Sequence, residues 1–126
     1  MTDTRTLITT IFQNFTVDSK AVPVQFMRYT GHEKTYVTWM QYDMDNSFSG
    51  DNEILGYVEY YDFDIYSSGK DPNFKGNYTN IIKQIKALLK ENGFEFQPSR
   101  CSADMFEDDT GYYHKTLCFA IYFEEE

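Results

Sequence analysis

The amino-acid sequence predicts one α+β domain over residues 1–126, with a single antiparallel or mixed sheet of about four to five strands and two helices packed on one face. Two observations support this fold class. Apolar residues recur with a helical period in two separate segments, and long β-branched and aromatic runs fill most of the remaining chain. Because the strands come in consecutive runs, three after the first helical segment and two after the second, and do not alternate regularly with helices, a parallel nucleotide-binding fold does not fit.

The first helix is expected from about Asp3 to Asn14, since its apolar residues form one helical stripe and Asp3 or Thr4 can cap its start. A short strand over residues 22–28 follows, and Pro23 confines it to a sheet edge or places this proline at the start of the strand. The stripe of the first helix consists of Leu7, Ile8, Ile11, Phe12 and Phe15.

Two strong strands come next, over residues 35–44 and 53–66, and both are rich in β-branched and aromatic side chains. Residues 45–52 between them are dense in turn formers, so we expect a loop there with Phe48 exposed in its middle. The strand over 53–66 carries aromatic rings on both sides and carboxylates in its second half. Such a strand is expected inside a sheet, with its more polar face covered by a partner protein.

A second loop, residues 67–76, has similar chemistry and contains Phe74. The second helix is expected from Asn77 to Asn92, because Asn77 can cap its start and the following glycine can supply a left-handed stop. The helix residues that we expect to be deeply buried are Leu7, Ile11, Phe12, Ile81, Ile85, Leu88 and Leu89.

The last two strands are expected from Phe94 to about Phe106 and from Tyr112 to Phe123, joined by an acidic turn over residues 107–111. Pro98 marks an edge or a bulge in the first of these strands, because proline has no backbone N–H to donate. The final strand alternates regularly and ends in a solvated tail of three glutamates, residues 124–126.

Acidic residues outnumber basic residues by 20 to 11, which gives a formal net charge of −9. Such a charge repels phosphate backbones and anionic lipids, so we expect neither nucleic acid nor a membrane as a direct partner. No apolar stretch approaches the length of a membrane span, and the start of the chain lacks the features of a signal peptide. We therefore expect a protein made and used in a cytosol.

Aromatic residues are unusually frequent, with 11 Phe, 11 Tyr and 1 Trp. One small core can hardly bury so many rings, so some are expected at interfaces with other proteins. Basic side chains are fewer, and three of them fill the outer face of the second helix. These are Lys83, Lys86 and Lys90.

Metal sites and cofactors are not expected. Cys101, Cys118, His32 and His114 could in principle supply four zinc ligands, but neither C-x-x-C nor H-x₃-H spacing is present. The segment from residue 43 to 50 has a calcium-loop rhythm of oxygen ligands at its start, yet it lacks the glycine and the bidentate glutamate of an EF-hand. Strand packing for the cysteines and a solvated hairpin loop for residues 43–50 are the favoured interpretations.

One enzymatic alternative remains, a dimeric aspartic protease using Asp109-Thr110-Gly111 from each subunit. The paired carboxylates of that chemistry must share a proton in a buried, apolar-walled site. Here two further carboxylates, Glu107 and Asp108, crowd the triplet and no apolar strand leads into it. An acidic turn between two strands is therefore favoured, and we expect no enzymatic activity and no cofactor.

Five segments of the chain are informative when they are taken in order. They are residues 22–31 (VPVQFMRYTG), 34–39 (KTYVTW), 60–68 (YYDFDIYSS), 85–94 (IKALLKENGF) and 107–115 (EDDTGYYHK). Together they resemble the tail terminator or tail-completion (head-tail joining) proteins of long-tailed phages and prophages of Gram-positive bacteria. The resemblance extends over about residues 20 to 123 and rests on structural motifs.

The resemblance implies an α+β subunit that forms a ring, commonly a hexamer, on the last disc of the tail tube. Such a ring stops tube polymerisation and presents a surface to the head connector. The implied partners are other copies of the chain, the major tail tube protein and the head-tail connector proteins. The implied location is the head-tail junction of the virion, after assembly in the host cytoplasm. A neighbouring connector component is the alternative within the same module.

Phe48 and Phe74 are the candidate residues for contact with other proteins, because they are large apolar groups in polar turn sequence. A neighbouring subunit or the tail tube could bury either ring. The alternative is that each ring folds back onto its own sheet and anchors a long loop.

Overall fold

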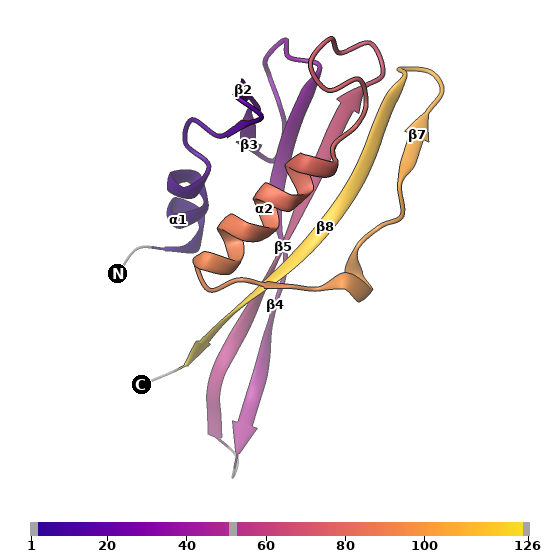
Figure 1. Ribbon diagram of the computed structural model, residues 1–126. Coiled ribbons are helices and arrows are strands. Elements are labelled where there is room, and N and C mark those ends of the chain that lie inside the picture. The colour runs from indigo at the N-terminus through magenta and orange to yellow at the C-terminus, as the bar shows by residue number, and fades with distance from the viewer. Residues whose placement is uncertain (1–2, 51–52, 125–126) are drawn as a thin grey trace.

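The computed structural model describes residues 3–50 and 53–124, with side chains described outside 43–50 and 53–55. Two helices pack on a six-stranded sheet, and a separate two-stranded ribbon follows the first helix (Figure 1). The helices are α1 (Thr4–Ile11), α2 (Thr79–Glu91) and the short 3-10 turn η1 (Pro98–Arg100). The strands are β1 (Thr16–Val17), β2 (Lys20–Ala21), β3 (Val24–Phe26), β4 (Thr35–Gly50), β5 (Glu53–Ser68), β6 (Glu95–Phe96), β7 (Met105–Glu107) and β8 (Tyr112–Glu124).

The sheet has the order β3-β4-β5-β8-β6, and β7 also pairs with β8. All pairs are antiparallel except β3 with β4, which run parallel. The α+β class with a mostly antiparallel, mixed sheet is therefore confirmed. The expected number of four to five strands is wrong, because the segment expected as one strand from Phe94 to Phe106 is divided into β6 and β7. Pro98, which cannot donate to a ladder, begins η1 at the break.

The hairpin between β4 and β5 differs most from expectation. Residues 45–50, expected in a loop, continue β4, and the register shifts between Gln41 and Asp43, between Asp45 and Phe48, and between Phe48 and Ser49. Such bulges allow turn-forming residues to lie within a strand, because the extra residues leave the ladder without ending it. Figure 1 shows the resulting two-stranded end projecting beyond the rest of the sheet.

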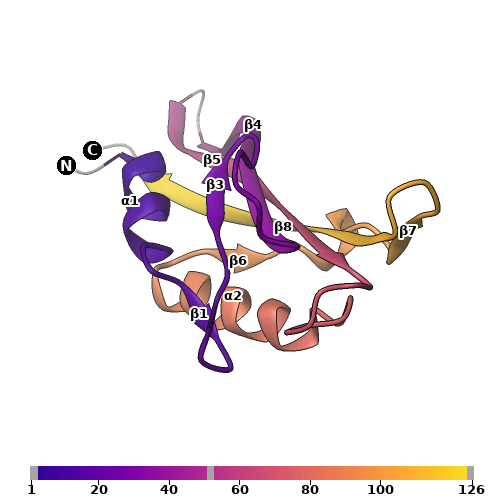
Figure 2. The same cartoon turned by 90° about the horizontal axis from the view of Figure 1, so that it is seen from above.

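The hydrophobic core lies on one face of β4, β5 and β8, and both helices contribute to it. Figure 2 shows the two helices on the same side of the sheet. From α1 come Ile8 and Phe12, whose ring centroid lies 5.6 Å from that of Phe63 on β5. From the other elements come Val37, Trp39, Tyr61, Phe63, Ile65, Ile81, Ile85, Leu89, Leu117, Phe119 and Ile121.

Burial of the helices follows the expected stripes only in part. Phe12, Ile81, Ile85 and Leu89 are buried as expected. Leu7, Ile11 and Leu88 are only half-buried, so the expectation of deep burial is wrong for these three side chains. They flank the centre of each stripe, where a helix that lies on an open sheet meets solvent on both sides.

Local signals set the helix ends. Asp3 caps α1, because its Oδ1 accepts a hydrogen bond of 2.8 Å from the backbone N–H of Thr6. The helix is shorter than expected and ends at Ile11, and Asn14 adopts a φ of 57° before β1 begins. At the end of α2, Gly93 has a φ of 88° and Phe94 N–H donates to the carbonyl of Leu89 at 2.9 Å. This geometry is a glycine-based stop of the Schellman type.

Candidate protein-contact surfaces

The second face of the sheet, opposite the core, is not covered by either described helix (Figure 2). The register aligns three rows of side chains across β4, β5 and β8 on this face. We call it the open face. Its central rows are Tyr36, Tyr66 and His114, then Thr38, Asp64 and Thr116, then Met40, Asp62 and Cys118.

A stack of aromatic rings crosses the open face. Ring centroids are separated by 4.4 Å between Tyr29 and Tyr36, by 5.0 Å between Tyr36 and Tyr66, and by 4.2 Å between Tyr66 and His114. Burial raises the pKa of the Tyr66 phenol to about 12, with the Asp64 carboxylate adding to the shift. The phenol therefore stays neutral at physiological pH, and the stack forms a rigid, half-buried apolar surface.

Asp64 lies at the centre of a polar cluster beside this stack. Its Oδ1 contacts His114 Nε2 at 3.2 Å and accepts a hydrogen bond of 2.5 Å from the Thr116 hydroxyl. In a hydrolytic triad the histidine stands between the carboxylate and the nucleophile. Here the carboxylate stands between the histidine and the hydroxyl, so His114 is not placed to take the proton of Thr116. The cluster orients side chains and does not activate a nucleophile.

A second cluster gathers Asp62 and Cys118 beneath Arg100, which reaches over the open face from η1. The Arg100 guanidinium carbon lies 3.9 Å from the ring centroid of Tyr60 and 5.4 Å from that of Tyr42. These contacts are cation–π interactions, and they hold the guanidinium over the sheet. A small cavity of about 190 Å³ is lined by Tyr42, Asp62, Arg100 and Cys118.

The thiol in this second cluster belongs to Cys118, which is buried with an exposed fraction of 1%. Burial raises the pKa of Cys118 to about 11, and the charge of Asp62 adds to the shift. Burial also raises the pKa of Asp62 itself. A nucleophilic cysteine needs a lowered pKa, so Cys118 is a packing residue that remains protonated at neutral pH.

Of the two contact residues named from composition, Phe74 is half-buried and packs against the core. The Lys20 ammonium lies 5.6 Å from its ring centroid. This is the arrangement expected of an anchor for the 67–76 loop. The backbone of Phe48 pairs with that of Gly56 within the hairpin. The side chain of Phe48 is not among those that the structure describes.

The Asp109-Thr110-Gly111 triplet lies in the turn between β7 and β8. Asp109 is exposed, as are its neighbours Glu107 and Asp108. The Thr110 hydroxyl donates to Glu107, and Gly111 adopts a φ of 74° that completes the turn. An aspartic protease requires a buried pair of carboxylates with apolar walls. In the described structure Asp109 is exposed and does not have this environment.

Among the residues that the structure describes, no group of three or more His, Cys, Asp or Glu side chains could hold a metal ion. Cys101 and Cys118 are free thiols. Cys101 donates a hydrogen bond to the carbonyl of Gln97 at 3.3 Å. This hydrogen bond links the two residues that flank the η1 turn.

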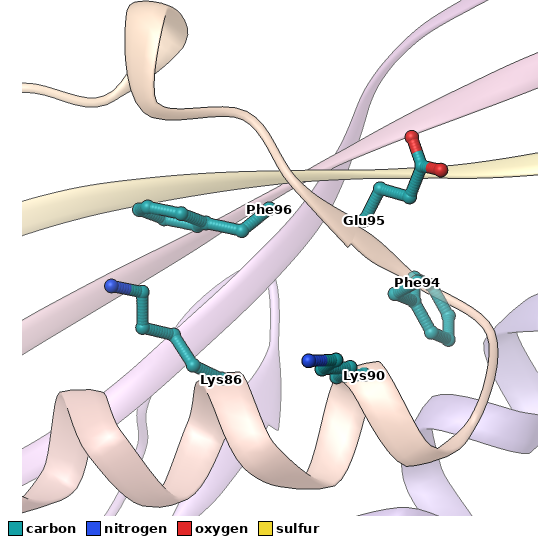
Figure 3. Close-up of a pocket in the computed structure, with 5 residues that line it drawn as sticks. All are labelled: Lys86, Lys90, Phe94, Glu95 and Phe96. Carbon is teal, nitrogen blue, oxygen red and sulfur yellow. The ribbon is translucent and has the colours of Figure 1, made fainter.

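A groove between α2 and β6 forms a second candidate surface, which sequence reasoning did not identify. It has a volume of about 460 Å³ and is lined by Lys86, Lys90, Phe94, Glu95 and Phe96. Figure 3 shows both lysines rising from α2 toward β6, whereas the Glu95 carboxylate points away from them. The Lys86 ammonium lies 4.1 Å from the ring centroid of Phe96.

The chain matches no family model and no curated protein. None of the helices in the described ranges is long and apolar enough to cross a bilayer.

Proposed function

We propose that this protein is a structural subunit of a phage tail. In this proposal copies of the chain assemble into a ring, proposed to be a hexamer, that caps the tail tube and joins the tail to the head connector. The observation that carries the proposal is the open face, a half-apolar sheet surface continued by the projecting β4–β5 hairpin. A partner protein can cover such a surface, whereas the cavity described on it, beside Asp62 and Cys118, holds only about 190 Å³ and is small for an organic substrate.

The outer edge of β4 strengthens the case for protein contacts. Among the described residues, β3 pairs with β4 only at positions 37–39, so the outer edge of β4 from Met40 to Gly50 has no strand beside it. An unpaired edge of this length presents free backbone N–H and C=O groups to another chain. Strand addition by a neighbouring subunit would satisfy these groups and extend the sheet from one subunit to the next.

The polar groups of the open face also favour a contact role over catalysis. Asp64 separates His114 from Thr116, and the thiol of Cys118 is held protonated by burial. Fixed hydrogen bonds and stacked rings give a surface of defined shape, which suits specific docking. Asp109, the residue of the protease alternative, is exposed in a turn and lacks the environment that this alternative requires.

Deleting the gene from the phage or prophage that carries it tests the proposal. We expect abnormally long tail tubes without attached heads in electron micrographs, because nothing would stop tube polymerisation. Expression of the wild-type chain should restore tail length, and an Asp109→Asn variant should restore it equally well. Tails of normal length, joined to heads, in the deletion strain would contradict the proposal. Headless tails of normal length would instead indicate a neighbouring connector component.

A further inference from the structure

Two opposite edges of the main sheet expose large apolar side chains. At one edge β3 ends beside Trp39, and from Met40 onward the outer edge of β4 has no described strand beside it; we call this stretch the β4 edge. At the other edge β7 pairs with β8 on its inner side, and its outer side has no described strand beside it. Large apolar side chains with exposed fractions of 38% or more lie at both edges: Phe26, Met27, Met40 and Tyr42 at the first, and Met105 and Phe106 on β7.

Opposite formal charges accompany these apolar side chains. Beside the β4 edge, the Arg5 guanidinium carbon lies 4.9 Å from the ring centroid of Phe26, and Arg28 is exposed two residues after Phe26. At the end of β7, Glu107 and Asp108 are exposed. None of these four charged groups belongs to an ion pair between described residues. The two edges are therefore complementary in charge, and both are apolar next to the charge.

Strand direction determines how the two edges would meet. Because β4 and β8 are both antiparallel to β5, and β7 is antiparallel to β8, β7 runs antiparallel to β4. Copies that extend the sheet from one subunit to the next in one sense keep these directions. The β7 strand of a neighbour would thus add to the β4 edge as an antiparallel strand. Its end at Glu107 and Asp108 would lie toward the end of β3, where Arg28 follows Phe26.

The alternation of side chains also matches between the two edges. Met105 is paired with His114, which lies on the open face, whereas Phe106 is paired with Tyr113. Phe106 therefore points to the side of the sheet that carries the core and α1. On that side a hollow of about 390 Å³ lies between α1 and the end of β3. The hollow is lined by Arg5, Thr6, Thr9, Thr10, Phe26 and Trp39.

We propose that β7 of one copy adds to the β4 edge of a neighbouring copy, with the ring of Phe106 in the hollow beside α1 and Asp108 close to Arg28. The inference rests on the ring assembly of the proposed function and names the two surfaces that join in it. One chain cannot make this contact with itself, because β4 and β7 lie on opposite sides of β5 and β8 (Figure 1). A contact between two different surfaces of identical subunits closes into a ring when the rotation between them allows it.

Charge reversal in the full-length chain tests this inference. Arg28→Glu and Asp108→Arg, made separately, should each weaken self-association at least about tenfold in sedimentation velocity, because each places like charges at the contact. The two changes combined should restore association, since every interface then carries the swapped pair. The matched controls are Lys83→Glu and Glu91→Arg, at exposed positions of α2, and both should associate like the wild type. All four residues are exposed, so every variant should keep the melting temperature of the wild type.

Nuclear magnetic resonance locates the contact even where association is weak. Unlabelled chain added to ¹⁵N-labelled chain, up to millimolar concentration, should shift the amide signals of residues 26–28, 40–42 and 105–108. Shifts confined to other residues, or single variants that associate like the wild type, would overturn the inference and leave the ring proposal standing.

Complementation of the deletion strain reads the same variants if copies associate only on the tail tube. Arg28→Glu or Asp108→Arg alone should leave tails abnormally long, whereas the combined variant should restore their length. Normal tails with either single variant would overturn the edge contact alone. If the deletion strain itself makes normal, head-joined tails and the wild-type chain does not self-associate, the ring proposal fails together with the inference.

Discussion

The imidazole of His114 lies flat on the ring of Tyr66, with the ring centroids 4.2 Å apart and the planes inclined by 11°. The same imidazole contacts Asp64 through Nε2 at 3.2 Å. These two contacts join neighbouring strands β5 and β8 on the open face and fix the histidine in one orientation. The open face is thus preorganised for contact, because its largest side chains need little further ordering when a partner binds.

Replacing Ile85 by alanine should lower the free energy of unfolding by about 2–5 kcal/mol, because Ile85 has an exposed fraction of 0% and its loss leaves a cavity. Leu88→Ala, on the same helix, is the matched control. It should cost only about 1–2 kcal/mol, since Leu88 is half-buried and solvent can fill the space. Urea denaturation followed by circular dichroism measures both, and equal costs would mean that the buried face of α2 is assigned incorrectly.

Cys118 should resist thiol reagents in the folded protein, because burial raises its pKa to about 11 and its exposed fraction is 1%. Cys101 is half-buried and should react first. The rate of thionitrobenzoate release at mildly alkaline pH measures this order. In a Cys101→Ser variant we expect almost no release until denaturant is added, and rapid release from the folded variant would contradict the described burial.

Asp62→Asn should gain stability relative to the wild type as the pH rises from about 3 to about 7. Burial raises the pKa of Asp62 above the ordinary value of 3.8, although Cys118 and Arg100 oppose the shift. The folded state therefore holds this proton more tightly than the unfolded chain. Its contribution to stability is complete below pH 3.8 and is lost as the pH rises through the folded-state pKa. Thermal unfolding of both proteins across this range measures the difference.

Asp104→Asn should show the opposite pH dependence. A hydrogen bond of 2.7 Å from the Tyr78 hydroxyl lowers the pKa of Asp104, and the Lys115 ammonium at 3.5 Å adds to the effect. The contribution of this carboxylate is present above the ordinary value of 3.8 and is lost as the pH falls through the lowered folded-state pKa. The wild type should therefore exceed the variant in stability at neutral pH, and the two should converge at low pH.

Replacing Phe74 or Phe48 by serine should have different consequences. Phe74→Ser should lower thermal stability, because Phe74 packs against the core. Phe48→Ser should weaken self-association, because Phe48 is a large apolar residue in polar turn sequence and belongs to the part of β4 whose outer edge has no described strand beside it. Melting temperature and sedimentation velocity separate the two effects. A fully folded Phe48→Ser chain that associates normally would remove Phe48 from the contact surface.

Local chemistry in the sequence determined the two helices, the strands β5 and β8, and the open face's mixture of rings and carboxylates. Asp3 caps α1 and Gly93 ends α2 through contacts with residues a few positions away, so these signals can be recognised without the fold. The alternating pattern of β5 likewise depends only on the period of a strand.

Tertiary structure alone decided the features that join distant residues. The parallel pairing of β3, the bulged extension of β4 and the division of residues 94–106 depend on which edge each segment meets. Asp64 meets Thr116 across 52 positions of the chain, and Arg100 reaches Tyr60 from a turn that sequence reasoning assigned to a strand. The groove of Lys86 and Phe96 likewise exists only once α2 has packed beside β6. Such juxtapositions follow from packing between segments, which local periodicity and capping do not encode.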